Sequence, residues 1–227
     1  MQNSTSTIKI KRLSNSSWFR LIWKNLVIHI DPGYSGSFEQ LDYPLKSLEK
    51  ADLILVSHNH MDHLQPDVFA YIFQKKTVVV APPRCMLEQY PYKGIVPGEI
   101  VSFHDIQITA VLAYNTDEGR SLKKYHLRGL FVGYLIDLGS RRIYFAGDTD
   151  VIPEMAFFGK VDIAFLPIGG TFVMDAEEAK DAIKIIRPKR VIPMHHAMCD
   201  LNEFKENIVE DDLAKVDVLY IGDEIEI

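Results

Sequence analysis

The order of the apolar segments along the chain constrains its fold more strongly than any other feature of the sequence. Three short apolar segments come first, at residues 8–13, 18–23 and 26–30, with turn-forming residues between them. Strand-like and helix-like segments then alternate as far as residue 90. This order predicts a β-meander that leads into strand–helix units.

The second half of the chain follows the same order. The predicted elements of the first half are strands at 53–57 and 77–81 and helices at 66–74 and 84–90. Those of the second half are strands at 100–103, 106–113, 130–138, 141–146, 161–166, 191–194, 216–221 and 224–227, and helices at 153–158 and 175–186. A meander followed by strand–helix alternation, present twice, predicts an α/β fold in which two mixed β-sheets pack face to face with helices outside. This is a four-layer αββα sandwich.

The clearest helix is the one predicted at 175–186, because apolar residues recur there at helical spacing. Asp175 can cap its N-terminus. Pro188 disfavours helical backbone at the residue before it, so the helix is expected to end there.

Composition and charge limit the partners of the chain. Of its 227 residues, 47% are hydrophobic, which is enough for one substantial core, and we expect a single domain over residues 1–227. The formal net charge of −6 argues against nucleic acid as a partner, because surfaces that bind polyanions carry an excess of Lys and Arg. We expect a small-molecule substrate, and a homo-oligomer stays open.

The sequence also predicts where the protein resides. No apolar segment follows a basic stretch near the N-terminus, and nowhere do about 18 apolar residues occur in a row. We therefore expect neither export nor a membrane partner. The two cysteines, Cys85 and Cys199, are too few for a disulfide framework. A cytoplasmic location is the prediction.

The strongest chemical signal is the hexapeptide at residues 58–63, with the sequence His-Asn-His-Met-Asp-His, directly after a predicted strand. Neutral imidazole and carboxylate groups are the usual ligands of catalytic zinc. The alternative is a polar turn whose histidines are solvated, which would be preferred for a single histidine. Three histidines and an aspartate at the end of a buried strand need partners, so we favour metal binding.

Three further polar residues follow predicted apolar strands, and they are Asp31, Asp148 and His195. Ligands of α/β sheets gather at such strand ends. The alternatives are an ordinary Gly-Asp turn at Asp148 and a buried, hydrogen-bonded histidine at His195. Their shared position after strands favours a common site with the hexapeptide.

The sequence resembles the metallo-β-lactamase superfamily, whose signature is His-x-His-x-Asp-His. It is most similar to a branch of metal-dependent hydrolases related to L-ascorbate-6-phosphate lactonase, and more distantly to phospholipase-D-type enzymes that cleave N-acyl phosphatidylethanolamines. The matching motifs follow in the same order at 31–33 (Asp-Pro-Gly), 58–63, 146–149 (Ala-Gly-Asp-Thr), 166–170 (Leu-Pro-Ile-Gly-Gly) and 192–195 (Ile-Pro-Met-His). The resemblance spans nearly the whole chain and implies the metallo-β-lactamase fold.

The resemblance implies roles for the hexapeptide residues in two neighbouring metal sites. His58 and His60 match the pair at the first site, and Asp62 and His63 match the pair at the second.

It also implies roles for the residues at the other strand ends. Asp148 matches the carboxylate that bridges both metals, and His195 matches the last ligand of the second site. Asp31 matches a carboxylate that orients the ligands. We expect His196, beside His195, to lie near the ligands or to face the substrate.

The sequence departs from the family pattern at the first site. Most members supply a further histidine after the strand equivalent to 106–113, where this chain has Tyr114-Asn115-Thr116. Either Asn115 binds the metal through its amide oxygen, or His126 reaches the site from later in the same loop. The first site is therefore expected to bind metal weakly or selectively, and occupancy by one metal stays open.

The ligand set predicts a metal-dependent hydrolase that uses a metal-bound hydroxide, because a metal can lower the pKa of bound water from about 15.7 to about 7. Asp62 and Asp148 are the predicted catalytic carboxylates, which would hold and orient this hydroxide. Imidazole and carboxylate ligands favour Zn²⁺, as one or two ions, with Mn²⁺ and Fe²⁺ as alternatives.

The polar segment at 114–129 is a candidate for contact with the substrate. Arg120, Lys124 and Arg128 within it are predicted to bind an anionic group, although a simply solvated basic loop is the alternative. Together with the resemblance, this favours a small anionic ester or lactone as substrate. A phosphodiesterase and a metal-binding protein with weakened catalysis stay open as alternatives.

Overall fold

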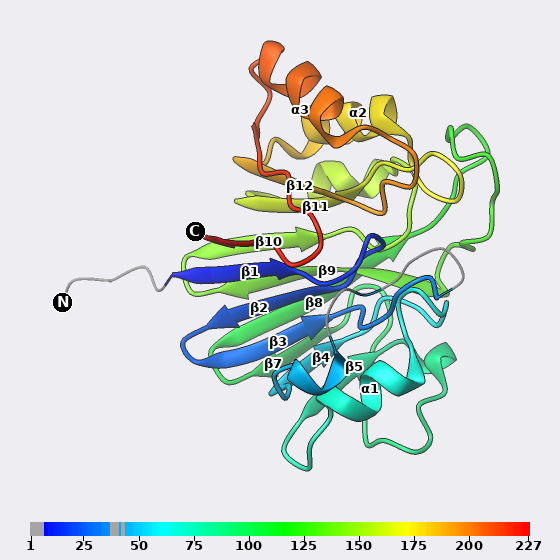
Figure 1. The fold of residues 1–227 in the computed structure, drawn as a ribbon. Helices are drawn as coiled ribbons and strands as arrows, with labels where there is room; N and C mark the ends of the chain where they lie inside the picture. Colours follow the sequence, from blue (N-terminus) through cyan, green and yellow to red (C-terminus); the bar gives the residue numbers. More distant parts are fainter. Residues whose placement is uncertain (1–6, 37–40, 42–43) are drawn as a thin grey trace. The chain divides into compact units, whose positions relative to one another are not determined.

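The computed structural model describes residues 7–36, 41 and 44–227, and the chain divides into two compact units. The first unit runs as far as Ile95 and takes in the C-terminal segment from Leu219, and the second is Val96–Val218. Among the described residues, each unit contains one seven-stranded mixed β-sheet (Figure 1). That residues 1–227 form one domain stays a prediction.

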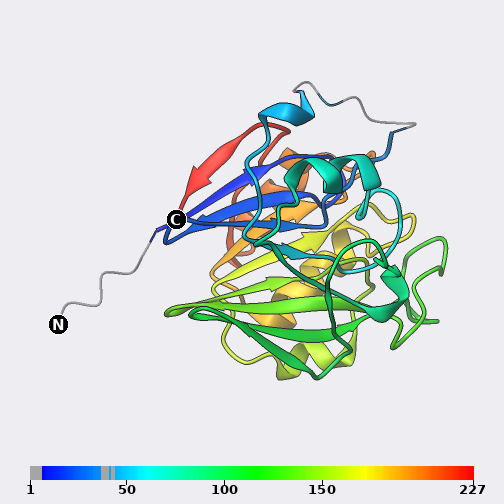
Figure 2. The same ribbon diagram turned by 90° about the horizontal axis from the view of Figure 1, so that it is seen from below.

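The sheet of the first unit has the strand order β14-β1-β2-β3-β4-β5-β6. Its strands are β1 (Ile8–Arg12), β2 (Phe19–Trp23), β3 (Leu26–Ile30), β4 (Leu53–Leu55), β5 (Val78–Ala81), β6 (Lys93–Gly94) and β14 (Glu224–Glu226). Pairing is antiparallel from β14 to β3 and parallel from β3 to β6. Figure 2 shows β14 (red) along β1 (blue), so a C-terminal strand extends the sheet at the meander.

A tight turn joins β2 to β3. Lys24 and Asn25 both have positive φ, at 48° and 64°, and Trp23 pairs with Leu26 across the turn. Two positive φ values in a two-residue loop are typical of a type I′ turn, whose twist matches that of the flanking strands. The predicted turn between these two strands is confirmed.

Helix α1 (Pro66–Ile72) packs on the parallel part of the first sheet. Pro66 begins the helix, where its fixed φ suits the first turn. The short 3₁₀ helices η1 (Leu45–Ser47) and η2 (Pro83–Cys85) lie in the loops of this unit. One hydrophobic cluster joins the buried side of α1 to β4 and β5, through Val68, Phe69, Ile72, Ile54 and Val79.

The sheet of the second unit has the order β13-β12-β11-β10-β9-β8-β7. Its strands are β7 (Ile100–Phe103), β8 (Ile106–Ala113), β9 (Phe131–Leu138), β10 (Arg141–Phe145), β11 (Ile163–Pro167), β12 (Arg190–Met194) and β13 (Lys215–Val216). Pairing is antiparallel from β7 to β10 and parallel from β10 to β13. The second sheet therefore repeats the antiparallel-then-parallel order of the first, as the segment pattern predicts.

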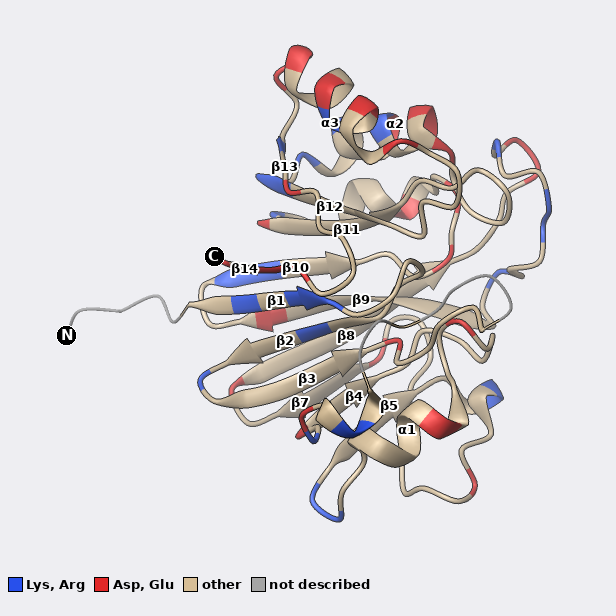
Figure 3. Cartoon of the chain, viewed as in Figure 1, with Lys and Arg blue, Asp and Glu red and all other residues tan. Residues whose placement is uncertain are grey.

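Helix α2 (Ala176–Ile186) has the predicted N-cap. The Asp175 carboxylate accepts a hydrogen bond from the backbone N–H of Glu178 at 2.8 Å. The helix ends at Arg187, whose backbone is left-handed, directly before Pro188. Charged residues of both signs lie along this helix (Figure 3), and three of them are exposed, namely Glu177, Asp181 and Lys184.

Three predicted elements differ from the structure. In place of a helix at 84–90, only the 3₁₀ turn η2 forms, and it ends at Met86, which has a φ of 45°. Pro91 also disfavours helical backbone at Tyr90. The strand predicted at 216–221 shortens to β13, and the helix predicted at 153–158 is the 3₁₀ helix η3 (Pro153–Phe157).

Helix α3 (Leu201–Glu210) was not predicted, although its signals are present in the sequence. The Asp200 carboxylate caps it by accepting hydrogen bonds from the backbone N–H groups of Asn202 and Glu203. Its buried side chains recur at helical spacing, and they are Leu201, Phe204 and Ile208. Among the described residues, no helix has the length and apolar character needed to cross a membrane.

His29 on β3 is a fully buried histidine in its neutral form. The indole N–H of Trp18 donates to His29 Nδ1 at 3.1 Å, and Nε2 lies 3.1 Å from the carbonyl oxygen of Glu49. Burial lowers the pKa of His29 to about 3, and the positive charge of Arg20 acts in the same direction.

We expect the free energy of unfolding to decrease as the pH falls below about 6.5, because the unfolded chain then binds a proton at His29 that the folded protein excludes. This loss, up to about 1.4 kcal/mol per pH unit, should continue towards the folded-state pKa of about 3. Urea unfolding between pH 7.5 and 5 in the presence of a chelator measures it. The variant His29→Gln should show a shallower dependence, and equal slopes in the two proteins would contradict the prediction.

Candidate metal centre

In the first unit, the carboxylate of Asp31 joins the ends of two neighbouring strands. Asp31 follows β3, and Ser57 follows the parallel strand β4, so both lie at the same edge of the sheet. The two Asp31 oxygens accept hydrogen bonds from the backbone N–H and the hydroxyl of Ser57, both at 2.6 Å. Burial raises the pKa of Asp31, while His63 and Ser57 act against this rise.

The same carboxylate also contacts an imidazole of the hexapeptide. His63 Nδ1 lies 2.8 Å from Asp31 Oδ2, and both side chains are fully buried. A carboxylate beside Nδ1 favours the proton on that nitrogen and leaves Nε2 to bind a metal. These contacts suit the role expected of Asp31, which is to orient ligands.

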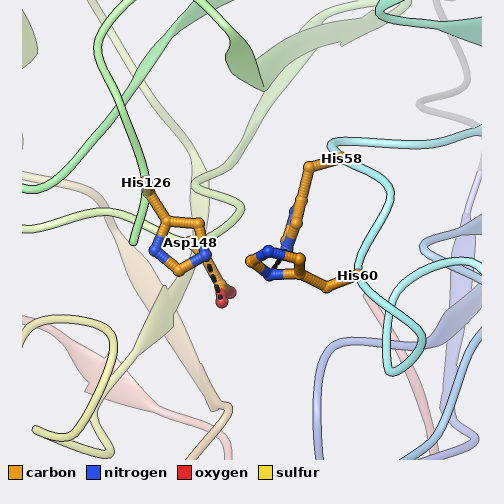
Figure 4. Close-up of side chains that lie close together, drawn as sticks. All are labelled: His58, His60, His126 and Asp148. Atoms are coloured by element: carbon orange, nitrogen blue, oxygen red, sulfur yellow. Dashed lines mark hydrogen bonds and ion pairs between the residues drawn. The ribbon is translucent and has the colours of Figure 1, made fainter. Parts of the chain in front are cut away.

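The hexapeptide folds into a tight turn that brings its histidines together. The backbone N–H groups of His63 and Leu64 both donate to the carbonyl oxygen of His60. His58 Nε2 lies 3.1 Å from His60 Nδ1 (Figure 4), and the His58 ring centroid lies 3.9 Å from that of His63. His58 Nδ1 contacts the Ser57 hydroxyl at 2.9 Å. Asp62 Oδ2 lies 3.6 Å from His63 Nε2. All four predicted ligands of the hexapeptide therefore gather within the first unit.

Gly33 allows this turn to approach the end of β3. A Cβ atom at Gly33 would lie 2.6 Å from backbone atoms of Met61, Asp62 and His63. No side chain fits at that distance, so the Asp-Pro-Gly motif and the hexapeptide are packed backbone to backbone.

In the second unit, Asp148 and His195 also follow parallel strands of one sheet. Asp148 comes after β10 and His195 after β12, with β11 between them. His195 Nε2 lies 3.4 Å from Asp148 Oδ2. His195 has a φ of 44°, and a Cβ at Gly169 would lie 2.4 Å from its carbonyl oxygen, so Gly169 permits this backbone path.

A second imidazole reaches Asp148, and it belongs to His126. His126 Nε2 lies 3.3 Å from Asp148 Oδ2, and both side chains are buried (Figure 4). Asn115 instead points its amide into the protein, where its NH₂ group donates to Asp150 Oδ1 at 3.1 Å and to the carbonyl oxygen of Phe172 at 2.9 Å. Of the two residues left open by the sequence, His126 is therefore the one that faces Asp148.

The predicted substrate-binding residues have protein partners in the second unit. Lys124 Nζ donates to the Gly119 carbonyl oxygen, the Ser121 hydroxyl and Asp150. Arg128 pairs with Glu154 at 2.7 Å, and Arg120 Nε lies 3.6 Å from Asp175. Substrate contact by these residues stays a prediction.

One of the remaining site residues was predicted from the sequence, and two were not. His196 is partly exposed, and its carbonyl oxygen accepts from the backbone N–H of Cys199 at 2.7 Å. Ser57 and Asp150 were not predicted as site residues, although Ser57 directly precedes the hexapeptide and Asp150 directly follows the Ala-Gly-Asp-Thr motif. Their role shows only in their contacts, because Ser, Thr and Asp after a strand are common in turns.

Comparison with known proteins relates the whole chain to one family. A model described as "Beta-lactamase superfamily domain" matches residues 9–195. A protein of Pyrococcus abyssi named UPF0173 metal-dependent hydrolase is 32% identical over 237 residues, which cover 97% of this chain and all of that protein. A UPF0173 metal-dependent hydrolase of Pelotomaculum thermopropionicum is 33% identical over 88% of this chain and 92% of its own length.

Solved structures share the fold. Igni18, described as a novel metallo hydrolase from Ignicoccus hospitalis, has a TM-score of 0.81 and 26% identity, covering 97% of this chain and 98% of its own. A structure from Parabacteroides distasonis has a TM-score of 0.84 and 30% identity, covering 94% and 93%. The predicted fold class, with two mixed β-sheets and helices outside, is confirmed.

We expect Gly33→Ala to lower the free energy of unfolding by about 1–3 kcal/mol, because the new methyl group must displace the hexapeptide backbone. Zinc affinity should fall in the same variant. Gly36→Ala is the matched control, since the nearest atom to a Cβ there is 3.7 Å away. Urea unfolding and calorimetric zinc titration measure the two effects, and equal results for both variants would argue against the prediction.

Proposed function

The chain belongs to the UPF0173 metal-dependent hydrolase family of the beta-lactamase superfamily, and we propose that it binds one or two zinc ions and hydrolyses a small anionic ester or lactone. The observation that carries the proposal is that imidazole and carboxylate side chains follow the parallel strands in each of its two units. The match to the family model covers residues 9–195, which include both sets.

The donor set of the second unit fits a bound cation. Two imidazole nitrogens, from His126 and His195, lie 3.3 and 3.4 Å from the same oxygen of Asp148. Ligand atoms at about 2.0–2.2 Å from a tetrahedral zinc ion lie about 3.4 Å from one another. These separations and the two imidazole donors suit zinc.

We assign each metal four protein ligands. The first set is His58, His60, His126 and Asp148, and the second is Asp62, His63, Asp148 and His195. With His126 in the position that the sequence leaves open, the first set is as complete as the second. A complete first site is therefore part of the proposal, in place of the weak first site that the missing histidine suggests.

A bound divalent ion lowers the pKa of water and polarises the oxygen of the group that is attacked. Asp62 is suited to take the proton of the attacking water, because its side chain is 24% exposed and keeps access to solvent. Water adds to the ester or lactone carbonyl carbon, the C–O bond to the leaving oxygen breaks, and a proton is delivered to that oxygen. Asp148 would keep the imidazoles of His126 and His195 in place during these steps.

The anionic character of the substrate rests on the resemblance and on the basic loop. An anion that binds Arg128 or Arg120 must compete with Glu154 or Asp175, the acidic partners of these residues. Both basic side chains are more than half exposed, so breaking their ion pairs costs little free energy.

We expect Asp62→Ala to lower kcat about 10²–10⁴-fold, the usual range for loss of a proton-transfer group. The assay measures acid release from a panel of lactones and esters by the zinc- or manganese-loaded protein, with chromogenic phosphodiesters alongside. Circular dichroism should show an intact fold. Asp67→Ala, which removes an exposed carboxylate from the first turn of α1, is the matched control and should retain activity.

Two outcomes would overturn the proposal. If the metal-loaded wild-type protein turns over only phosphodiesters, the proposed esterase or lactonase function is wrong and the protein is a phosphodiesterase. If it binds metal fully and turns over no substrate, and Asp62→Ala has no consequence in cells, the protein is a metal-binding protein without catalysis.

A further inference from the structure

The segment that carries His126 has no regular secondary structure to hold it. Residues 114–130, between β8 and β9, form neither helix nor strand. A buried imidazole on such a segment keeps one orientation only if other contacts fix it. The contacts around His126 therefore decide whether it can act as a ligand.

Both atoms near His126 Nδ1 are hydrogen-bond acceptors. Nδ1 lies 3.1 Å from the side-chain oxygen of Asn115 and 3.1 Å from the backbone carbonyl oxygen of Phe172. A carbonyl oxygen can only accept, so Nδ1 carries the proton. In the neutral ring the lone pair then lies on Nε2, the nitrogen beside Asp148.

The orientation of the Asn115 amide follows from its own partners. The backbone N–H of His126 donates to Asn115 Oδ1 at 2.9 Å, so an oxygen must stand there. The amide nitrogen faces Asp150 Oδ1 at 3.1 Å and the Phe172 carbonyl oxygen at 2.9 Å, which are both acceptors. A flipped amide would lose all of these hydrogen bonds.

Asp150 also fixes the segment of residues 115–124, which we call the strap. Its Oδ2 accepts hydrogen bonds from the backbone N–H of Thr116 at 2.9 Å and from Lys124 Nζ at 3.0 Å. A Cβ at Gly119 would lie 2.1 Å from the same oxygen, so only glycine lets the strap close over this carboxylate. The position of Asn115 is therefore fixed both by the hydrogen bonds of its own amide and by those that Asp150 accepts from Thr116 and Lys124.

We infer that Asn115 is a positioning residue, which holds His126 with its proton on Nδ1 and its Nε2 lone pair directed to the metal that Asp148 shares. Asn115 also holds the Phe172 carbonyl, the second acceptor at Nδ1, so it acts on the imidazole directly and through Phe172. The inference rests on the proposed function for its metal, but the protonated nitrogen can be measured without metal or substrate.

The experiment uses metal-free, full-length protein labelled with ¹⁵N at histidine. Two-bond ¹H–¹⁵N correlation spectra report which ring nitrogen is protonated, and His126→Gln assigns the signal among the eight histidines. Wild-type protein should show His126 protonated at Nδ1. In Asn115→Ala a population protonated at Nε2 alone, without the Nδ1 proton, should appear, and zinc affinity should fall about 10–100-fold, the usual range for loss of a residue that orients a ligand.

Two further variants separate positioning from a general effect on the loop. Asn115→Asp keeps an acceptor oxygen at His126 and should keep the Nδ1-protonated form, although its other oxygen then faces Asp150 and the Phe172 carbonyl and should lower the free energy of unfolding. Leu122→Ala removes a side chain that is 81% exposed on the same strap, and it should match wild type in both measurements.

Wild-type protein with His126 protonated at Nε2 alone, and not at Nδ1, would overturn the inference, and this holds even if Asn115→Ala does not fold. Zinc affinity unchanged in a folded Asn115→Ala would also overturn it. Failure of the wild-type protein to hydrolyse any ester, with Nδ1 protonated and zinc bound, would instead overturn the proposed function alone.

Discussion

Parallel strand pairing is the constraint on which the candidate metal centre depends. The carboxyl ends of parallel neighbours lie at one edge of a sheet, so residues that follow those strands are brought together although they are distant in sequence. In the first unit this joins Asp31 to the start of the hexapeptide, and in the second it joins Asp148 to His195. Asp31 and Asp148 each follow the strand at which the antiparallel part of the sheet ends and the parallel part begins.

Each unit also contains a buried carboxylate that holds a loop with an imidazole on it. Asp31 accepts hydrogen bonds from Ser57 and contacts His63, and Asp150 accepts from Asn115, which contacts His126. A buried carboxylate is costly unless its oxygens are hydrogen-bonded, so both acids restrict the loops that satisfy them. In both places a glycine, Gly33 or Gly119, permits the close approach that these bonds require.

Much of the fold was predictable because local signals agreed with tertiary structure. Apolar periodicity, the turn at Lys24-Asn25 and the cap at Asp175 act within a few residues, and each stands where it was expected. The helix expected at 84–90 failed because Met86 takes left-handed backbone, which periodicity does not report. Helix α3 was not predicted, because only three buried residues carry its helical spacing over ten positions.

The sequence by itself determined the chemistry of the candidate site, because imidazole and carboxylate groups after apolar strands have few other uses in a buried place. The order of the apolar segments along the chain also determined the strands of the two sheets. Only tertiary structure decided which of Asn115 and His126 faces Asp148. Both lie on a segment without helix or strand, so no spacing rule relates them, and the choice depends on hydrogen bonds to Asp150 and Phe172 from other parts of the chain.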